Sequence, residues 1–142
     1  MALFDYSPDE VDVLVAGIPI TGWADGEFLT IEMTTDAFTS VVGTDGEVTR
    51  NRSNDNRATA TVKLMQSSAS NDLLSALYNT DRLARNGAGI GAFLVKDNQG
   101  RSLYAAAECW IRKHPDISFD REATAREWVI EIADLQVFTG GN

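Results

Sequence analysis

Hydrophobic and polar residues alternate along several short stretches of this chain, the period-two pattern of β-strands with one buried face. The clearest stretch is 28–34, whose apolar side chains point one way while Thr30, Glu32 and Thr34 point the other. Strands are predicted at residues 11–15, 28–34, 58–64, 90–96, 102–112 and 126–138. With one helix added, the pattern predicts a mainly β fold, a sandwich or barrel of six to seven strands with a flanking α-helix.

The helix is predicted over residues 70–85. Apolar residues recur there at helical spacing, Ser70 is a good N-cap, and Asn86-Gly87 ends the pattern. In the 102–112 strand, alternation places Ala105 and Ala107 on the same face as Cys109.

Residues 35–56 break the alternation, and we expect a long polar loop there within a single domain spanning 1–142. A connection of about 20 residues inside a compact domain is unusual and is often functional. Its first half carries Phe38, Val41 and Val42, so that half has apolar side chains to bury.

Charge is unevenly distributed along the 142 residues, whose net charge is −9. Residues 1–49 hold ten acids and no base, residues 50–113 ten bases and five acids, and residues 114–142 six acids and two arginines. Either one fold brings these segments together, or complementary surfaces steer copies of the chain onto one another. Both readings make this acidic chain a poor candidate to grip the phosphates of DNA.

The residues that usually carry catalysis or metal binding are scarce. There is one histidine, His114, and one cysteine, Cys109, too few for a typical zinc site or facial triad. Cys109 falls on the apolar face of a predicted strand, and no Gly-x-Ser-x-Gly elbow occurs. We therefore expect no enzyme, no cofactor and no metal. No apolar stretch approaches the roughly 20 residues of a membrane helix, so we expect no membrane insertion.

Three local stretches resemble one protein family: Val-Gly-Thr-Asp-Gly-Glu-Val at 42–48, Arg-Ser-Asn-Asp-Asn at 52–56, and Ser-Asn-Asp-Leu-Leu-Ser-Ala-Leu at 70–77. With the order of elements, they make the chain similar, over about residues 13–138, to the tail tube proteins of contractile-tailed phages. That family is related in fold to the type VI secretion tube protein.

The resemblance implies a structural virion protein. Six copies would form a ring, and stacked rings would form a hollow tail tube through which DNA passes without specific binding. Sheath, baseplate and tail-terminator proteins would be partners, with assembly in the host cytoplasm and a final place in the virion tail. Two alternatives are the tube subunit of a phage-derived contractile injection system or bacteriocin and, from another class, a small-ligand-binding β-barrel.

Two sets of residues are assigned roles on this basis. Alternation assigns one polar set to the lumen: Thr30, Glu32, Thr34, Lys63, Glu127 and Glu131. The second set lies in or beside the 35–56 segment and is expected to bridge one subunit to its neighbour: Phe38, Val41, Val42, Asp45, Glu47, Arg50, Arg52 and Arg57.

Overall fold

The computed structural model describes residues 3–141, which form ten strands, one α-helix and a short 3-10 helix. The elements before the helix are η1 (Pro8–Glu10), β1 (Val11–Val15), β2 (Ile18–Pro19), β3 (Leu29–Met33), β4 (Phe38–Val42), β5 (Val48–Arg52) and β6 (Ala58–Met65). Then follow α1 (Ser70–Leu83), β7 (Gly91–Asp97), β8 (Leu103–Lys113), β9 (Ala125–Ile132) and β10 (Gln136–Phe138). The mainly β class with one flanking helix is confirmed, but the expected number of strands was too low.

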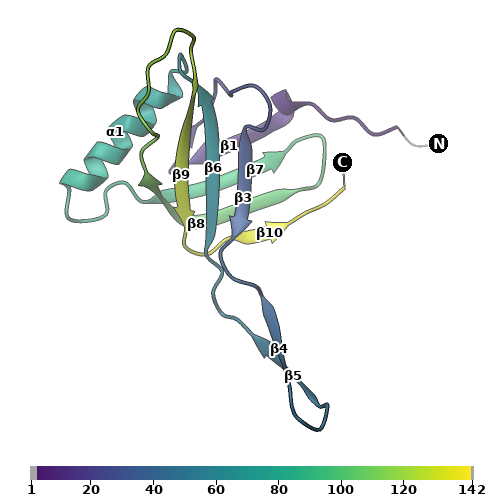
Figure 1. The fold of residues 1–142 in the computed structure, drawn as a ribbon. Helices are drawn as coiled ribbons and strands as arrows, with labels where there is room; N and C mark the ends of the chain where they lie inside the picture. The colour runs from purple at the N-terminus through teal and green to yellow at the C-terminus, as the bar shows by residue number, and fades with distance from the viewer. Residues whose placement is uncertain (1–2, 142) are drawn as a thin grey trace.

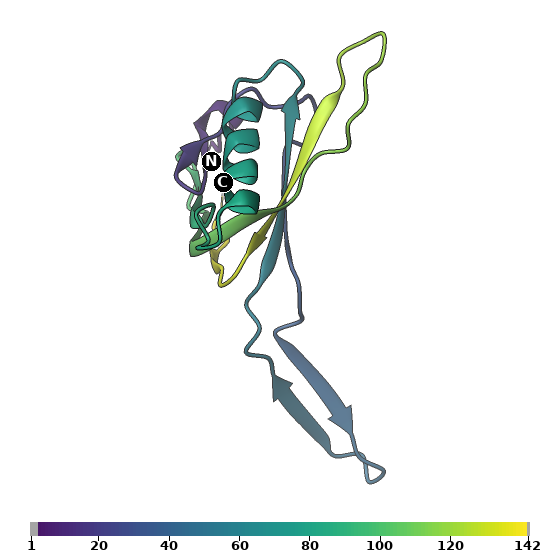
Figure 2. The ribbon, with the colours of Figure 1, turned by 90° about the vertical axis from the view of Figure 1, so that its left-hand side faces the viewer.

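Eight strands form one sheet in the order β2-β1-β7-β8-β9-β6-β3, with β10 pairing β8 beside this path. Every described pairing in it is antiparallel. Within the described residues no ladder joins β2 to β3, so the sheet is open and is not a closed barrel. Figure 1 shows this curled sheet with α1 beside it, and Figure 2 shows the helix lying along one side of the sheet.

The core lies on the side of the sheet that faces α1. In β6 every second residue, from Ala58 to Leu64, is fully buried, and in β9 Trp128, Ile130 and Ile132 are buried in the same way. Strands β1, β7 and β8 add further apolar side chains, and Leu74 of the helix packs among them. These side chains pack together on the inner side of the curl as one hydrophobic core.

The start of the helix differs from the prediction. Ala69 occupies the N-cap position, and Ser70, predicted as the cap, is instead 2% exposed. Its Oγ accepts a hydrogen bond from the backbone N–H of Thr21 (2.9 Å). Ser68 Oγ also donates to the Thr21 carbonyl (2.6 Å), so the two hydroxyls tie the start of the helix to the chain beyond β2. The serine serves a tertiary contact, which helical spacing does not reveal.

The segment predicted as a loop, 35–56, contains the β4–β5 hairpin, and the loop prediction is wrong. Its five cross-strand pairs form a separate two-stranded sheet that projects from the body (Figures 1 and 2). Gly46, with φ +87°, supplies the left-handed position of the turn, and Gly43 N–H donates to the Glu47 carbonyl (2.8 Å). Both hairpin faces are exposed, so neither face needs the apolar alternation that marks a half-buried strand.

Two irregularities overturn details of the later strands. Between β7 and β8 the register shifts, so Ala106 and Cys109 both face the core although they are three residues apart. The extra residue is a β-bulge, which reverses the expected faces of the first half of β8. The predicted 126–138 strand is broken at residues 133–135, where Leu135 turns inward and its N–H donates to the Asn56 carbonyl (3.1 Å). Both parts, β9 and β10, still pair with β8.

The β9 faces give a stability test with a built-in control. We expect Ile130→Ala to lower the free energy of unfolding by about 2–5 kcal/mol, because Ile130 is fully buried. Val129→Ala, one residue away on the opposite face, is expected to cost no more than about 1 kcal/mol. Urea denaturation followed by tryptophan fluorescence measures both. Equal losses, or a larger loss at Val129, would contradict the assigned faces.

Candidate assembly surfaces

The side of the sheet opposite the core is polar across four adjacent strands. Cross-strand pairs join Glu32 to Thr59, Thr59 to Glu131, and Glu131 to Trp110. Lys63 lies directly opposite Glu127 in the same ladder. This polar sheet face consists of Thr30, Glu32, Thr59, Thr61, Lys63, Trp110, Arg112, Glu127, Val129 and Glu131.

The structure thus brings together five of the six residues assigned to a lumen. The sixth, Thr34, lies one position past the end of β3, where its N–H donates to the Arg57 carbonyl (3.0 Å). Whether this face lines a lumen stays a prediction.

Arg112 belongs to the same face and was given no role from the sequence. Its Nη1 lies 3.8 Å from Glu131 Oε1 and 3.5 Å from Thr59 Oγ1. The face therefore carries three glutamates against Lys63 and Arg112, a balance of −1 per copy. A partly exposed ion pair of this kind contributes at most about 1 kcal/mol. Its main effect is to make the face closer to neutral than the glutamates alone suggest.

The hairpin has one face that combines apolar and cationic groups. Phe38, Ser40 and Val42 of β4 lie opposite Arg52, Arg50 and Val48 of β5. The Arg50 guanidinium lies 3.7 Å from the centre of the Phe38 ring. We call Phe38, Val42, Val48, Arg50 and Arg52 the hairpin face. Val41 is exposed on the opposite side, paired with Thr49.

The two acidic residues assigned to the hairpin lie at its turn. Asp45 Oδ1 accepts the backbone N–H of Glu47 (3.2 Å), a contact that helps to close the turn. Asp45 thus has a local structural role as well as its predicted contact with another subunit.

A cluster of side chains clamps the base of the hairpin. Arg57 donates from Nε and Nη2 to the two carboxylate oxygens of Asp55, both at 2.9 Å, and Thr35 donates to Oδ2 at 2.6 Å. The hydrogen bonds from Arg57 and Thr35 hold the pKa of Asp55 well below its ordinary value. Arg57, assigned to an inter-subunit contact, thus has a partner in its own chain, and its role between copies stays a prediction.

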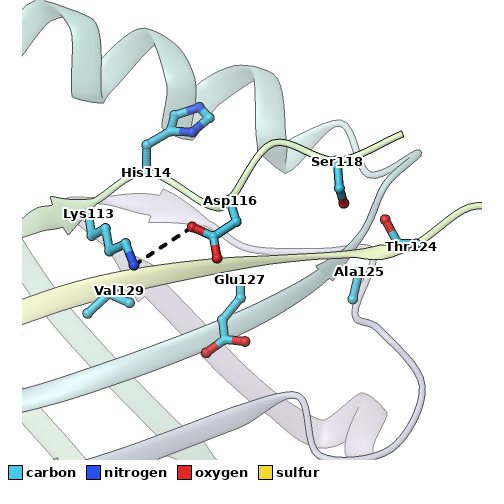
Figure 3. A pocket seen from close by; sticks show the side chains of 8 residues that line it. All are labelled: Lys113, His114, Asp116, Ser118, Thr124, Ala125, Glu127 and Val129. Atoms are coloured by element: carbon cyan, nitrogen blue, oxygen red, sulfur yellow. Dashed lines mark ion pairs between the residues drawn. The ribbon is translucent and has the colours of Figure 1, made fainter. Parts of the chain in front are cut away.

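A shallow cleft of about 230 Å³ lies between the end of β8 and the start of β9 (Figure 3). Lys113 Nζ and Asp116 Oδ1 lie 3.8 Å apart at its rim. His114 turns away from the carboxylates of Asp116 and Glu127 (Figure 3). Its ring packs 5.6 Å from Tyr78 and 5.0 Å from Trp128, measured between ring centres. The single histidine is thus part of an aromatic cluster.

Other chemistry is limited in the described part of the chain. Burial raises the pKa of the Cys109 thiol, which disfavours the reactive thiolate. No three His, Cys, Asp or Glu side chains among residues 3–141 gather as they would around a metal ion. A groove of about 340 Å³ runs between β3 and β10, lined mainly by apolar side chains such as Ile31 and Val137. None of the helices formed by the described residues has the length and apolar character to span a membrane.

Known proteins share the sequence pattern and the fold of this chain. Residues 18–140 match the family described as Bacteriophage PhiTE tail tube protein. Structural protein ORF10 of Pseudomonas phage KPP10 is 36% identical over 143 residues, covering 96% of this chain and 83% of the relative. Among solved structures, the tube-terminating cap of the anti-feeding prophage has a TM-score of 0.59 at 6% identity and covers 98% of this chain and 94% of its own.

The sheath/tube terminator, in its extended state, of the extracellular contractile injection system PVC has a TM-score of 0.65 at 10% identity and covers 98% of this chain and 100% of its own. The two solved structures show the fold alone, which this chain shares with a tube-terminating cap and a sheath/tube terminator. Sequence and fold together define the class, a phage tail structural protein. The model of the PhiTE tail tube protein family matches most of the chain, so the chain belongs to that family. The resemblance to phage tail tube proteins is thereby confirmed.

The clamp at the hairpin base leads to a prediction on pH. We expect Asp55 to stay ionised at about pH 4, where an ordinary aspartate is about half protonated. Because the folded pKa lies below the unfolded one, the clamp stabilises the fold above the unfolded pKa and is lost as the pH falls through the folded pKa. A carboxyl-carbon NMR titration of the monomer measures this. Arg57→Gln should raise the Asp55 pKa, and an ordinary pKa in the unsubstituted protein would contradict the clamp.

Proposed function

We propose that this chain forms the wall of a phage tail tube, with six copies in each ring and rings stacked around a channel for DNA. The observation that carries the proposal is the open sheet with a core on one side and a continuous polar face on the other. Open sheet edges present unpaired backbone groups that another chain can cover. A heterologous contact of this kind closes into a ring when its rotation fits. Membership of the tail tube family supports the same role.

The polar sheet face lines the channel in this proposal. DNA phosphates bind where Lys and Arg replace their condensed counterions. The face carries Lys63 and Arg112, but Lys63 lies opposite Glu127 and Arg112 contacts Glu131. Its cations are therefore balanced by neighbouring carboxylates, and its remaining residues are three threonines, Glu32, Trp110 and Val129. Phosphates would gain little free energy from counterion release on this face, so DNA passes without being retained.

The β4–β5 hairpin bridges one subunit to another. A two-stranded hairpin is marginally stable alone in water, yet this one projects from the body and exposes Phe38, Val41, Val42 and Val48. Covering these side chains with a neighbouring copy removes apolar surface from water. The proposal thus keeps the bridging role predicted for the 35–56 segment and assigns it to a hairpin instead of a loop.

The wider setting follows from this role. The chain acts as a structural protein without catalysis, is assembled in the host cytoplasm and ends in the virion tail. Sheath, baseplate and terminator proteins contact it there, and it does not insert into a membrane. A phage-derived contractile injection system would use the same subunit in the same way. Family membership favours these structural roles over the binding of a small ligand in the β3–β10 groove.

A second candidate is the terminator or cap of such a tube. It is favoured by the two solved structures, a tube-terminating cap and a sheath/tube terminator, each of which covers 98% of this chain. A terminator covers the end of a tube made of another protein, whereas a tube subunit polymerises with itself. Negative-stain microscopy of the purified chain separates the two, because self-made tubes favour the first and rings that never stack into tubes favour the second.

Removal of the hairpin tests the bridge. Residues 38–52 can be replaced by Asn-Gly, because the Ser53 N–H already donates to the Ala37 carbonyl (2.9 Å) and holds the ends together. We expect a folded protein, checked by circular dichroism, that no longer forms tubes by sedimentation velocity and microscopy. If this variant still makes normal tubes, the hairpin is only a surface projection.

Reversal of one wall charge tests the channel. Glu32→Lys changes the polar sheet face from −1 to +1 per copy. We expect intact particles that eject DNA more slowly, with the largest delay at low salt. Glu32→Gln controls for the side chain, and Asp72→Lys places the same change on α1 behind the core. Equal delays from Glu32→Lys and Asp72→Lys would argue against this face as the channel wall.

A further inference from the structure

The connection between β8 and β9, residues 114–124, lies at the opposite end of the molecule from the hairpin. Strand β6 follows the hairpin, starts at Ala58, and ends at Met65, which pairs with Ala125 just after this connection. Eight strand residues span about 25 Å. Figures 1 and 2 show the hairpin and the β8–β9 connection leaving the body in opposite directions. The hairpin therefore cannot reach residues 114–124 of its own chain.

This end loop, defined as residues 114–124, exposes large apolar side chains. Ile117 is 76% exposed and Phe119 is 83% exposed. Around them lie the acids Asp116, Asp120 and Glu122 and the base Arg121, and two flanking bases also contact the loop: Lys113 lies 3.8 Å from Asp116, and Arg126 lies over the Phe119 ring. The end loop is thus apolar at its centre, with three carboxylates around it, of which Asp116 already contacts Lys113.

Contacts with the body hold the end loop in place. Arg126 Nη2 donates to the Ser118 carbonyl (3.0 Å), and its guanidinium lies 5.7 Å from the centre of the Phe119 ring. The Thr124 N–H donates to Gln66 Oε1 (3.1 Å). A surface that is already ordered loses less conformational entropy when a partner binds. The exposed Phe119 is therefore presented in a fixed position.

The hairpin face complements the end loop in its apolar side chains and in its charge. It offers Phe38, Val42 and Val48 as apolar groups, and Arg50 and Arg52 as cations. Arginine forms strong, often bidentate, hydrogen bonds with carboxylates such as those of Asp116 and Asp120. Two exposed surfaces of matching chemistry thus lie at opposite ends of one chain.

We propose that the end loop is the docking surface for the hairpin face of a second copy, so that copies join head to tail. This rests on the proposal that the hairpin bridges subunits, and it adds the surface that receives the hairpin. Such a contact is heterologous, since each copy gives its hairpin to one neighbour and its end loop to another. A stack built this way has a direction, with unoccupied hairpins at one end and unoccupied end loops at the other.

Charge reversal on both surfaces tests the pairing. We expect R50E/R52E and D116R/D120R each to block assembly, because like charges then face each other. A chain with all four changes restores opposite charges and should assemble with itself, but not with the unsubstituted chain. Sedimentation velocity and two-colour co-assembly measure this, and circular dichroism shows that each variant is folded.

The apolar contribution of the end loop to the proposed contact can be tested with a matched control variant. Phe119→Ser should raise the critical concentration for assembly about tenfold or more, the usual loss for a buried aromatic anchor. Leu83→Ser removes an equally exposed side chain, 86% exposed at the end of α1, and should leave assembly unchanged.

The outcomes separate the two proposals. Failure of the unsubstituted chain to assemble would overturn the proposed function. If it assembles and R50E/R52E blocks assembly while the end-loop variants do not, the hairpin bridges copies but docks elsewhere, and this inference is wrong. Failure of the folded fourfold variant to assemble with itself would also overturn the pairing.

Discussion

The pairing of β6 with β9 is the constraint on which the rest of the structure depends. Eight successive residue pairs, from Ala58–Ile132 to Met65–Ala125, align the two strands, which lie between β8 and β3 in the sheet. A shift of one residue would turn Trp128 and Ile130 out into water and bring the glutamates of β9 into the core. Because burial of those apolar side chains strongly favours one register, the polar residues of both strands are held together on the other side.

That register has consequences at both ends of the strand pair. Where β6 begins, the chain has just left the hairpin, and where β6 ends, β9 emerges from the residue 114–124 connection. Neither surface contributes to the core, so stability of the single fold does not explain their exposed apolar side chains. Local contacts nonetheless order both surfaces: the Asp55–Arg57–Thr35 clamp at one, and Arg126 and Gln66 at the other. An ordered apolar surface outside the core is the feature expected of a protein that completes its burial by assembly.

The electrostatics of the polar sheet face also change once strands are paired. The glutamates alone describe an acidic wall, but Arg112 is brought beside Glu131 by the β8–β9 pairing, and Lys63 beside Glu127 by the β6–β9 pairing. A face on which charges nearly balance and several residues are threonines neither attracts nor strongly repels a polyanion.

The sequence by itself determined the β class, the helix and the position of most strands. It also determined the two faces of β3, β6 and β9, because burial of one face imposes a period of two directly on the local sequence. Likewise, Glu32, Lys63, Glu127 and Glu131 could be predicted to point away from the core. Only the tertiary structure decided that they share one surface, since strand order depends on pairings between distant segments. The reversed faces of β8, the break before β10 and the tertiary role of Ser70 have the same origin in nonlocal hydrogen bonds. The hairpin escaped prediction for a different reason: without a core beneath either face, its strands carry no burial pattern, and only backbone pairing defines them.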